Sequence, residues 1–254
     1  MAQPLPGMIR YWPSTMTSRA LTDEGLTMTD LTALLESNPY PGRGVLVART
    51  HSGAVWGSYF LTGRSAASKD RALRLASDEL LVGPSTPTGH DPLRHYTAAA
   101  ATDDWLVFGN GEQVSQVTGK LLGGASAVDS LSGLEYEPDP PIRTSRITIL
   151  LARDGGRTAV LGAARPSRAA RQTTNVMTLT VSFLEPGEAV LMTTYQSDGK
   201  TVSVGEPFEE VTVKAIDGEQ LADEVWSALS PEFRVAAVVL DPLKGPATAL
   251  LRSA

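Results

Sequence analysis

Cysteine is absent from the 254-residue sequence, and histidine occurs only three times. Without a thiol the chain can form no disulfide, no cysteine-ligated metal site and no thiolate nucleophile. Cysteine content therefore does not indicate whether the protein works in an oxidising or a reducing compartment. His90 and His95 lie near Asp91 and His51 falls in a turn, but no two histidines have the helical spacing of metal ligands. We therefore expect surface or loop histidines and no metal site.

Long apolar runs and an excess of positive charge are also lacking. No stretch approaches the roughly 20 apolar residues that cross a bilayer, and the N-terminus has no basic segment followed by an apolar one. The chain carries 22 basic against 28 acidic side chains, a formal charge of −6, which argues against nucleic acid or an anionic membrane as partner. We expect a cytoplasmic protein, and a small anionic ligand is compatible with this charge.

The first 27 residues are poor in apolar periodicity and contain three prolines, whereas a better pattern begins after Met28. We interpret residues 1–28 as a disordered leader, with Met28 as an alternative start of the chain. No repeat or linker divides the rest, so residues 29–254 are expected to form one domain.

Strand patterns dominate this domain. The expected strands cover residues 44–50, 54–63, 104–109, 146–153, 157–165, 176–185, 188–195, 233–240 and 248–253, and the segments from 146 to 195 follow one another as a meander. Helices are expected after a cap at Thr29 or Asp30, over 112–122 and over 219–229, while 71–82 fits either a strand or a helix. These elements predict an α+β protein with largely antiparallel sheets.

No phosphate-binding loop, dinucleotide fingerprint, nucleophile elbow or zinc-binding helix motif occurs, so candidate sites come from less regular clusters. Arg43 stands between two glycines just before a strand, and the segment 61–71 after the next strand contains Arg64, Ser65 and Arg71. Guanidinium groups, hydroxyls and loop amides of this kind can bind a phosphate. The alternative interpretation is a solvated basic loop.

A second cluster lies in the proline-rich segment 134–143, which is expected to be a loop. Tyr136, Glu137 and Asp139 place a phenol and two carboxylates on a backbone stiffened by prolines. A general acid or base requires such a fixed geometry. An exposed loop with incidental acidic residues is the alternative.

Eight segments together carry a resemblance to a known family. They are PYPGRGVLVART, YFLTGRSAASKDR, HYTAAA, FGNGEQV, LEYEPDPPIRTSRITIL, TTYQSDGK, GEPFEEV and ALSPEFRVAAVVLDPLKG. In order and approximate spacing they resemble the archaeal-type IMP cyclohydrolase family over residues 29–245. The resemblance implies a four-layer αββα sandwich like that of the N-terminal nucleophile hydrolases, without their self-processing, and an enzyme that needs no metal or redox cofactor.

The reaction implied by the resemblance closes the pyrimidine ring of a formylated aminoimidazole carboxamide ribonucleotide. The carboxamide nitrogen attacks the formyl carbon and water is lost, which gives inosine monophosphate. Because both reacting groups belong to one substrate, holding them together supplies much of the acceleration, and proton transfer remains for the protein. Carried over by motif, the catalytic residues are Tyr96, Asn110, Glu137 and Asp139, and the substrate-binding residues are Arg43, Arg64, Ser65, Arg71, Tyr136, Arg146 and Tyr195.

Two positions depart from the family pattern, since Thr97 and Asp70 stand where asparagines are expected. They motivate an alternative, a paralogue that performs a related cyclisation on another nucleotide-like amide. A catalytically silent nucleotide-binding protein is the other alternative. In each case the expected partner is a small nucleotide-like molecule. The sequence does not decide between a monomer and a homo-oligomer.

A chain that begins at Met28 is expected to match the full chain in melting temperature and activity. The reason is that residues 1–27 carry too little apolar surface to offset the entropy of ordering them. Thermal unfolding and activity of the two chains, measured side by side, check this expectation. A clear loss of either in the shorter chain would show that the leader packs on the domain.

Overall fold

The computed structural model describes residues 28–85, 91, 93–167, 172–204 and 207–254. The predicted leader, apart from Met28, and His90 therefore lie outside the described residues. Sheet A runs in the order β1 (Thr29–Asp30), β14 (Glu209–Thr212), β11 (Glu188–Thr193), β2 (Arg43–Arg49), β3 (Val55–Thr62), β15 (Arg234–Asp241) and β16 (Gly245–Ser253).

Sheet B runs in the order β10 (Thr174–Val181), β9 (Ala159–Pro166), β8 (Arg146–Ala152), β7 (Trp105–Gly109), β6 (Tyr96–Ala101), β5 (Glu79–Gly83) and β4 (Ala72–Ala76). A separate short hairpin joins β12 (Gln196–Ser197) to β13 (Val202–Ser203). Neighbouring strands are antiparallel except β1 and β14, which are parallel. The predicted combination of helices with largely antiparallel sheets is thereby confirmed.

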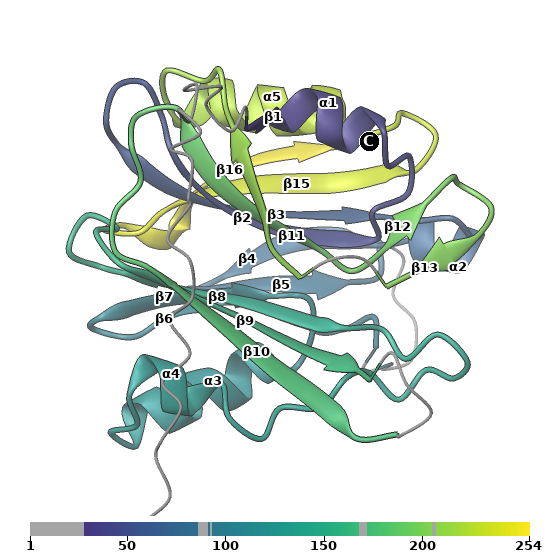
Figure 1. Ribbon diagram of the computed structural model, residues 1–254, viewed down its shortest axis with the longest axis horizontal. Coiled ribbons are helices and arrows are strands. Elements are labelled where there is room, and N and C mark those ends of the chain that lie inside the picture. The colour runs from purple at the N-terminus through teal and green to yellow at the C-terminus, as the bar shows by residue number, and fades with distance from the viewer. Residues whose placement is uncertain (1–27, 86–90, 92, 168–171, 205–206) are drawn as a thin grey trace, which may run out of the picture.

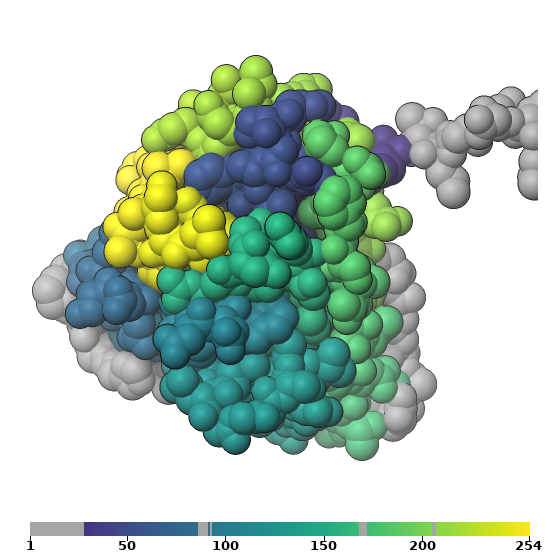
Figure 2. Space-filling view, turned by 90° about the vertical axis from the view of Figure 1, so that its left-hand side faces the viewer, coloured from purple at the N-terminus to yellow at the C-terminus, as the bar shows by residue number. Residues whose placement is uncertain are grey.

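Helices cover the outer face of each sheet (Figure 1). α1 (Leu31–Glu36) and α5 (Gly218–Ala228) pack on sheet A, whereas α3 (Gln113–Leu122) and α4 (Ala127–Ser130) pack on sheet B. α2 (Ala66–Lys69) is a single turn that follows β3. The layers therefore follow one another as helices, sheet, sheet and helices. In the space-filling view of Figure 2, the yellow part of the chain lies against the blue part that holds β4 and β5. β16 of sheet A contacts β4 and β5 of sheet B.

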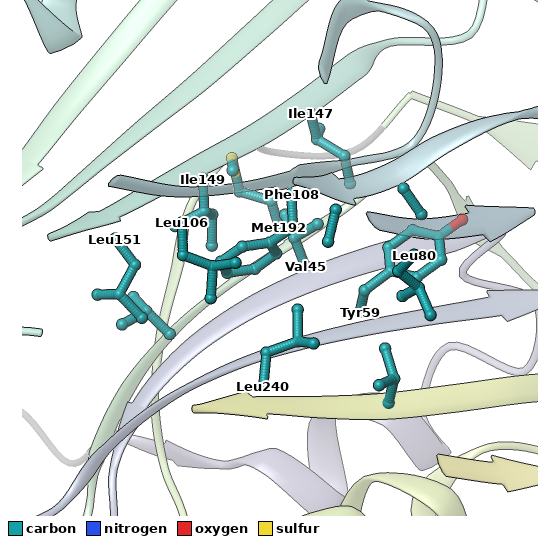
Figure 3. Close-up of a cluster of buried hydrophobic side chains, with 14 of the residues drawn as sticks. Val45, Tyr59, Leu80, Leu106, Phe108, Ile147, Ile149, Leu151, Met192 and Leu240 are labelled. Carbon is teal, nitrogen blue, oxygen red and sulfur yellow. The ribbon is translucent and has the colours of Figure 1, made fainter. Parts of the chain in front are cut away.

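The apolar residues of the central strands are shared between two cores. In β2, Val45 and Val47 lie in the core between the sheets, whereas Leu46 and Ala48 lie in the core under α1 and α5. Because successive side chains of a strand point to opposite faces, a strand buried on both faces needs a continuous apolar run. Figure 3 shows the core between the sheets, in which Phe108 is fully buried.

Most predicted elements are present, with ends shifted by a few residues. Asp30 caps α1, since its side chain accepts a hydrogen bond from the Ala33 amide. The ambiguous residues 71–82 form two strands, β4 and β5, joined by a tight turn in which Ser77 has a φ of 55°. The proline-rich residues 134–143 contain neither helix nor strand, as expected.

The predicted meander through residues 176–195 is wrong. β10 pairs with β9 in sheet B, whereas β11 pairs with β2 and β14 in sheet A. The chain therefore passes from one sheet to the other at Pro186 and Gly187. The Gly187 amide donates to the Arg49 carbonyl over 2.8 Å. Long-range backbone pairing therefore determines which sheet the chain enters after Gly187, and a local turn signal cannot specify that choice.

Strand β6 has no counterpart among the predicted elements. Its sequence ends in four alanines, which have low strand propensity. Ala98, Ala99 and Ala100 are nevertheless buried, and β6 packs against α3. Tertiary packing therefore forms this strand, and small side chains let the helix approach it.

Gly57→Ala is expected to destabilise the fold by about 1–3 kcal/mol, the usual cost of overpacking a core. A Cβ at Gly57 would lie 2.7 Å from Cζ of Phe108 across the interface between the sheets. Gly83→Ala is the matched control, because nothing lies within 4 Å of a Cβ at that strand position. Urea unfolding of both variants measures the difference, and equal stability would show that the two sheets are not in tight contact at Phe108.

Candidate functional site

A pocket of about 170 Å³ lies where β2 meets the loop that precedes β8. Its lining residues are Tyr40, Gly42, Arg43, Thr62, Ser68, Arg71, Leu93, Arg94, Glu137, Asp139 and Tyr195. Larger hollows occur, such as one of about 470 Å³ beside β4 and β16. The smaller pocket is the candidate site because a buried ion pair and several buried polar groups converge on it.

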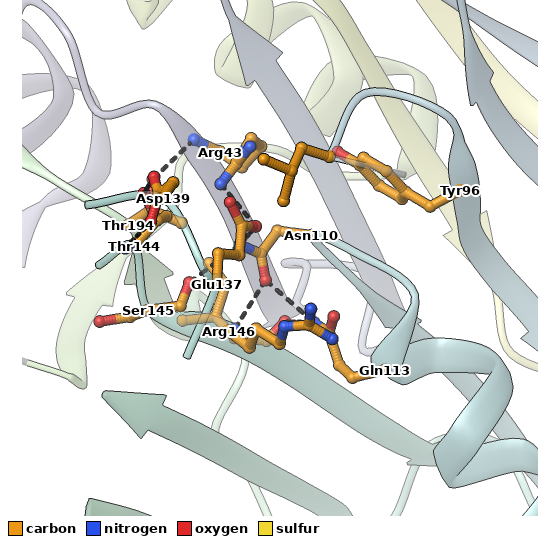
Figure 4. Close-up of polar contacts among 12 residues, drawn as sticks. Arg43, Tyr96, Asn110, Gln113, Glu137, Asp139, Thr144, Ser145, Arg146 and Thr194 are labelled. Atoms are coloured by element: carbon orange, nitrogen blue, oxygen red, sulfur yellow. Dashed lines mark hydrogen bonds and ion pairs between the residues drawn. The ribbon is translucent and has the colours of Figure 1, made fainter. Parts of the chain in front are cut away.

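The ion pair joins Arg43, the first residue of β2, to Glu137 in the proline-rich loop (Figure 4). Nη2 of Arg43 lies 2.8 Å from Oε1 of Glu137, and the two residues are 8% and 4% exposed. Burial raises the pKa of the Glu137 carboxyl, and the Arg43 guanidinium opposes that shift. The carboxylate is thus more basic than an exposed one while an adjacent cation favours its charged form.

Asn110 fixes the carboxylate from the other side. Its Nδ2 donates to Oε1 of Glu137 over 3.2 Å and to the Ser145 carbonyl over 2.9 Å. Its Oδ1 accepts from the Ile147 amide over 2.7 Å and from Nε2 of Gln113 over 2.9 Å. Asn110 is fully buried, and these bonds hold its amide in one orientation, with the donor toward Glu137.

Asp139 and Tyr195 meet at Thr144. The Thr144 amide donates to Oδ1 of Asp139 over 2.7 Å, and the Thr144 hydroxyl contacts Oδ2 of Asp139 and the Tyr195 hydroxyl, each over 2.5 Å. Burial raises the pKa of the Tyr195 phenol, while Arg43 acts in the opposite direction. Two predicted site residues are therefore linked by a residue that the sequence did not single out.

Tyr96 approaches the site from sheet B. Its hydroxyl lies 2.7 Å from that of Tyr59 on β3, and in Figure 4 it points toward Arg43. Burial, followed by the interaction with Tyr96, raises the pKa of Tyr59 well above the ordinary phenol value. The two sheets thus contribute facing phenols beside the ion pair.

The candidate phosphate ligands differ in their surroundings. Arg71 is buried, lines the pocket, and donates to the Thr62 and Ser68 carbonyls over 2.8 Å. Arg64 is exposed, with its guanidinium 5.2 Å from the centre of the Tyr40 ring, which lines the pocket. Ser65 caps the short helix α2 by a reciprocal pair of hydrogen bonds with Ser68.

Two further predicted residues lie outside the pocket lining. Arg146 is buried beside the Asn110 network, and its Nη2 lies 3.0 Å from Oε1 of Glu112. Tyr136 donates from its hydroxyl to the Gln172 carbonyl over 2.7 Å and lines a separate surface hollow with Pro138. The structure therefore unites Arg43, Arg71, Glu137, Asp139 and Tyr195 around one pocket, with Asn110 and Tyr96 beside it.

The residues of the site that the sequence did not predict include Tyr40, Gln113, Thr144 and Thr194. Tyr40 and Gln113 lie inside the segments PYPGRG and FGNGEQV that carry the resemblance, so those segments held a signal for them. Thr144 and Thr194 each act through a single hydroxyl, and Oγ1 of Thr194 accepts a hydrogen bond from the Arg43 amide. A single threonine in a sequence gives no comparable signal.

Within the ranges that the structure describes, no three His, Asp or Glu side chains gather as a metal site would require. No helix in those ranges is long and apolar enough to cross a bilayer. The arrangement can bind an anion through two buried guanidinium groups. It can also accept or donate protons through two carboxylates and nearby phenols.

Comparisons with known proteins cover the part of the chain that contains this site. The sequence profile of the family described as IMP cyclohydrolase-like protein matches residues 40–242. A curated IMP cyclohydrolase of Methanothrix thermoacetophila is 28% identical over 193 residues, which cover 74% of this chain and 85% of that protein. All of the pocket-lining residues lie within the profile match.

Arg43→Met is expected to destabilise the protein by about 3–5 kcal/mol near neutral pH, because it leaves the Glu137 carboxylate buried without its cation. In this variant the opposing effect of Arg43 is lost and burial raises the pKa of Glu137 further. A folded-state pKa above the unfolded value of about 4.3 means that stability is retained below that value and falls as the pH rises.

Melting temperatures of the variant and the unmodified protein between pH 4 and pH 8 check this sign. The difference in melting temperature between Arg43→Met and the unmodified protein should be small at acid pH and should increase toward neutral pH. Arg49→Met is the matched control on the same strand, because the Arg49 guanidinium donates to the Gly53 and Leu184 carbonyls. A gap for Arg43→Met that does not change with pH would mean that the ion pair is not the source of the destabilisation.

Proposed function

The chain belongs to the IMP cyclohydrolase-like family, and on that premise we propose that it closes the pyrimidine ring of a formylated aminoimidazole carboxamide ribonucleotide to give inosine monophosphate and water. One observation carries the proposal. Arg43, Glu137 and Asn110 form a buried, hydrogen-bonded group beside a pocket, within the part of the chain that matches the family. Buried and paired charges of this kind occur preferentially where chemistry needs them.

Substrate binding is assigned to the basic and aromatic wall of the pocket. Arg71 and the more exposed Arg64 are the proposed phosphate ligands, because guanidinium forks match phosphate oxygens. The rings of Tyr40 and Tyr195 stack with centres 5.9 Å apart and an interplanar angle of 24°, and they form a flat surface that suits a planar heterocycle. Ser65 and Tyr136, which lie outside the pocket lining, are retained as proposed substrate contacts.

The proposed chemistry needs no nucleophilic side chain, since the substrate carries both reacting groups. Glu137 is placed to accept or direct a proton of the carboxamide nitrogen, and its raised pKa makes it a better base than an exposed carboxylate. Arg43 can stabilise negative charge that develops on the former formyl oxygen. Tyr96, Asp139 and Arg146 are the proposed supporting groups, with Asn110 holding Glu137 in place.

The order of layers supports a four-layer sandwich that resembles the fold of the N-terminal nucleophile hydrolases. We propose that this protein does not undergo their self-processing. We further propose one domain over residues 29–254, a cytoplasmic location and a role in purine biosynthesis. Neither a metal nor a redox cofactor enters this chemistry. A small-molecule substrate is what the family leads us to expect.

The test is incubation of the protein with the formylated nucleotide, followed by ultraviolet absorbance of the purine product. Glu137→Gln keeps the shape of the side chain and removes its charge, so kcat is expected to fall about 10²–10⁴-fold with nucleotide affinity little changed. Glu135→Gln is the matched control, because Glu135 is an exposed carboxylate on the same loop. Its rate is expected to stay at the unmodified value.

The outcomes separate the alternatives. Turnover by the unmodified protein supports the proposed cyclisation, and binding without turnover supports a silent nucleotide-binding protein. Failure to bind or turn over points to a paralogue with a different amide substrate, as Thr97 and Asp70 suggest. A Glu137→Gln variant that keeps more than about a third of the rate would remove Glu137 from proton transfer.

A further inference from the structure

Thr144 occupies a position that is unusual for a residue outside the pocket lining. It is fully buried just before β8, and it contacts two residues that do line the pocket. Its hydroxyl oxygen lies 2.5 Å from Oδ2 of Asp139 and 2.5 Å from the Tyr195 hydroxyl. Three oxygen atoms therefore form an unbroken chain that begins and ends at the pocket.

The direction of the hydrogen bonds follows from counting hydrogens. An ionised carboxylate only accepts, so the single hydroxyl hydrogen of Thr144 is donated to Asp139. The Thr144 amide already donates to the other carboxylate oxygen over 2.7 Å. Since the Thr144 hydroxyl has no second hydrogen, the short contact with Tyr195 requires the phenol to be the donor. The chain is thus ordered from Tyr195 through Thr144 to Asp139.

Tyr195 is held firmly at the pocket end of this chain. Its ring packs against Tyr40 and, through Tyr40, against Phe233. Its backbone amide donates to the Pro41 carbonyl over 3.1 Å, and its carbonyl accepts from Nδ2 of Asn38 over 2.8 Å. With its hydrogen directed to Thr144, the phenol oxygen keeps its lone pairs for a proton donor in the pocket.

On the premise of the proposed function, we propose that Thr144 relays a proton from the substrate to Asp139 through Tyr195. As the carboxamide nitrogen, directed by Glu137, attacks the formyl carbon, its N–H proton passes to the Tyr195 oxygen. The phenol proton passes to Thr144 and the Thr144 proton to Oδ2 of Asp139. One C–N bond forms, the formyl C=O pair moves onto oxygen, and return of the proton along the same chain makes that oxygen a hydroxyl.

In this relay the half-exposed Asp139 is the final proton acceptor, and its carboxylate does not need to contact the reacting nitrogen. It also gives a reason for a threonine at position 144, because a hydroxyl both donates and accepts, whereas an apolar side chain of the same shape can do neither. A purely structural role, in which Thr144 only fastens the loop to Asp139, predicts a loss of stability instead of a loss of rate.

Thr144→Val and Thr144→Ser test the relay, with Thr50→Val as the matched control. Thr50 is a fully buried threonine in the turn after β2, and its hydroxyl donates to the Ala54 carbonyl. We expect Thr144→Val to lower kcat about 100-fold, the lower end of the range for acid–base groups, with KM little changed. Thr144→Ser and Thr50→Val should keep kcat within about threefold of the unmodified value. Melting temperatures report folding for all three variants.

Tyr195→Phe and the double variant Tyr195→Phe, Thr144→Val decide whether the two hydroxyls act as one unit. Groups of one relay are non-additive, so the double variant should be no slower than Tyr195→Phe alone. Additive losses would overturn the relay. Equal rates for Thr144→Val and Thr144→Ser, or a KM effect with kcat unchanged, would also overturn it.

A measurement without substrate separates the relay from the proposed function. The Tyr195 phenol can be titrated by nuclear magnetic resonance of ring-labelled tyrosine, with Tyr195→Phe for assignment. The phenol faces Arg43, Glu137 and Asp139 as well as Thr144, and its hydrogen bond to Thr144 favours the protonated phenol, because the phenol is the donor. Thr144→Val removes the acceptor and should therefore lower that pKa, whereas Thr144→Ser should leave it unchanged. An unchanged titration overturns the relay, and a shifted titration in a protein that does not close the ring refutes only the proposed reaction.

Discussion

The buried ion pair between Arg43 and Glu137 is the constraint on which the rest of the site depends. Removing two charges from water costs several kcal/mol per ion, and the attraction between them offsets this cost only when the remaining hydrogen-bonding capacity is also met. Asn110 meets part of it at Oε1 of Glu137, and its own amide is fixed by Gln113, Ser145 and Ile147. The polar network around the pocket is therefore a condition for burying the pair, and it also fixes the direction in which the carboxylate points.

The fold makes this burial possible because β2 lies inside a sheet covered on both faces. Val45 and Val47 pack between the sheets and Leu46 packs under the helices, so the start of the strand, where Arg43 stands, is held by two cores. Sheet B supplies Asn110 after β7 and the Glu137 loop before β8. The site is thus assembled across the interface between the sheets, and packing between them determines the distance between the charged partners.

Much of this architecture could be predicted because local patterns carried it. Continuous apolar runs predicted the central strands, and the Asp30 cap predicted α1. The strand β6 and the crossing at Gly187 could not be predicted, since alanine has little strand propensity and pairing partners are chosen by distant residues. For the site, the segments around Arg43, Asn110 and Glu137 were informative as a set. The hydrogen bonds of the site could not be predicted in the same way. The bond between Thr144 and Tyr195, for example, joins loops 51 residues apart.

The site combines rigid and adaptable parts. Arg43, Asn110 and Gln113 are almost fully enclosed, so their geometry is set before a ligand binds and costs no reorganisation during the reaction. Arg64 is more exposed, and a charged ligand can reach it from solvent. Arg64 at the rim and Glu137 in the interior therefore differ in burial. A phosphate at the rim must shed only part of its water, whereas a proton must move between atoms already held within hydrogen-bond distance.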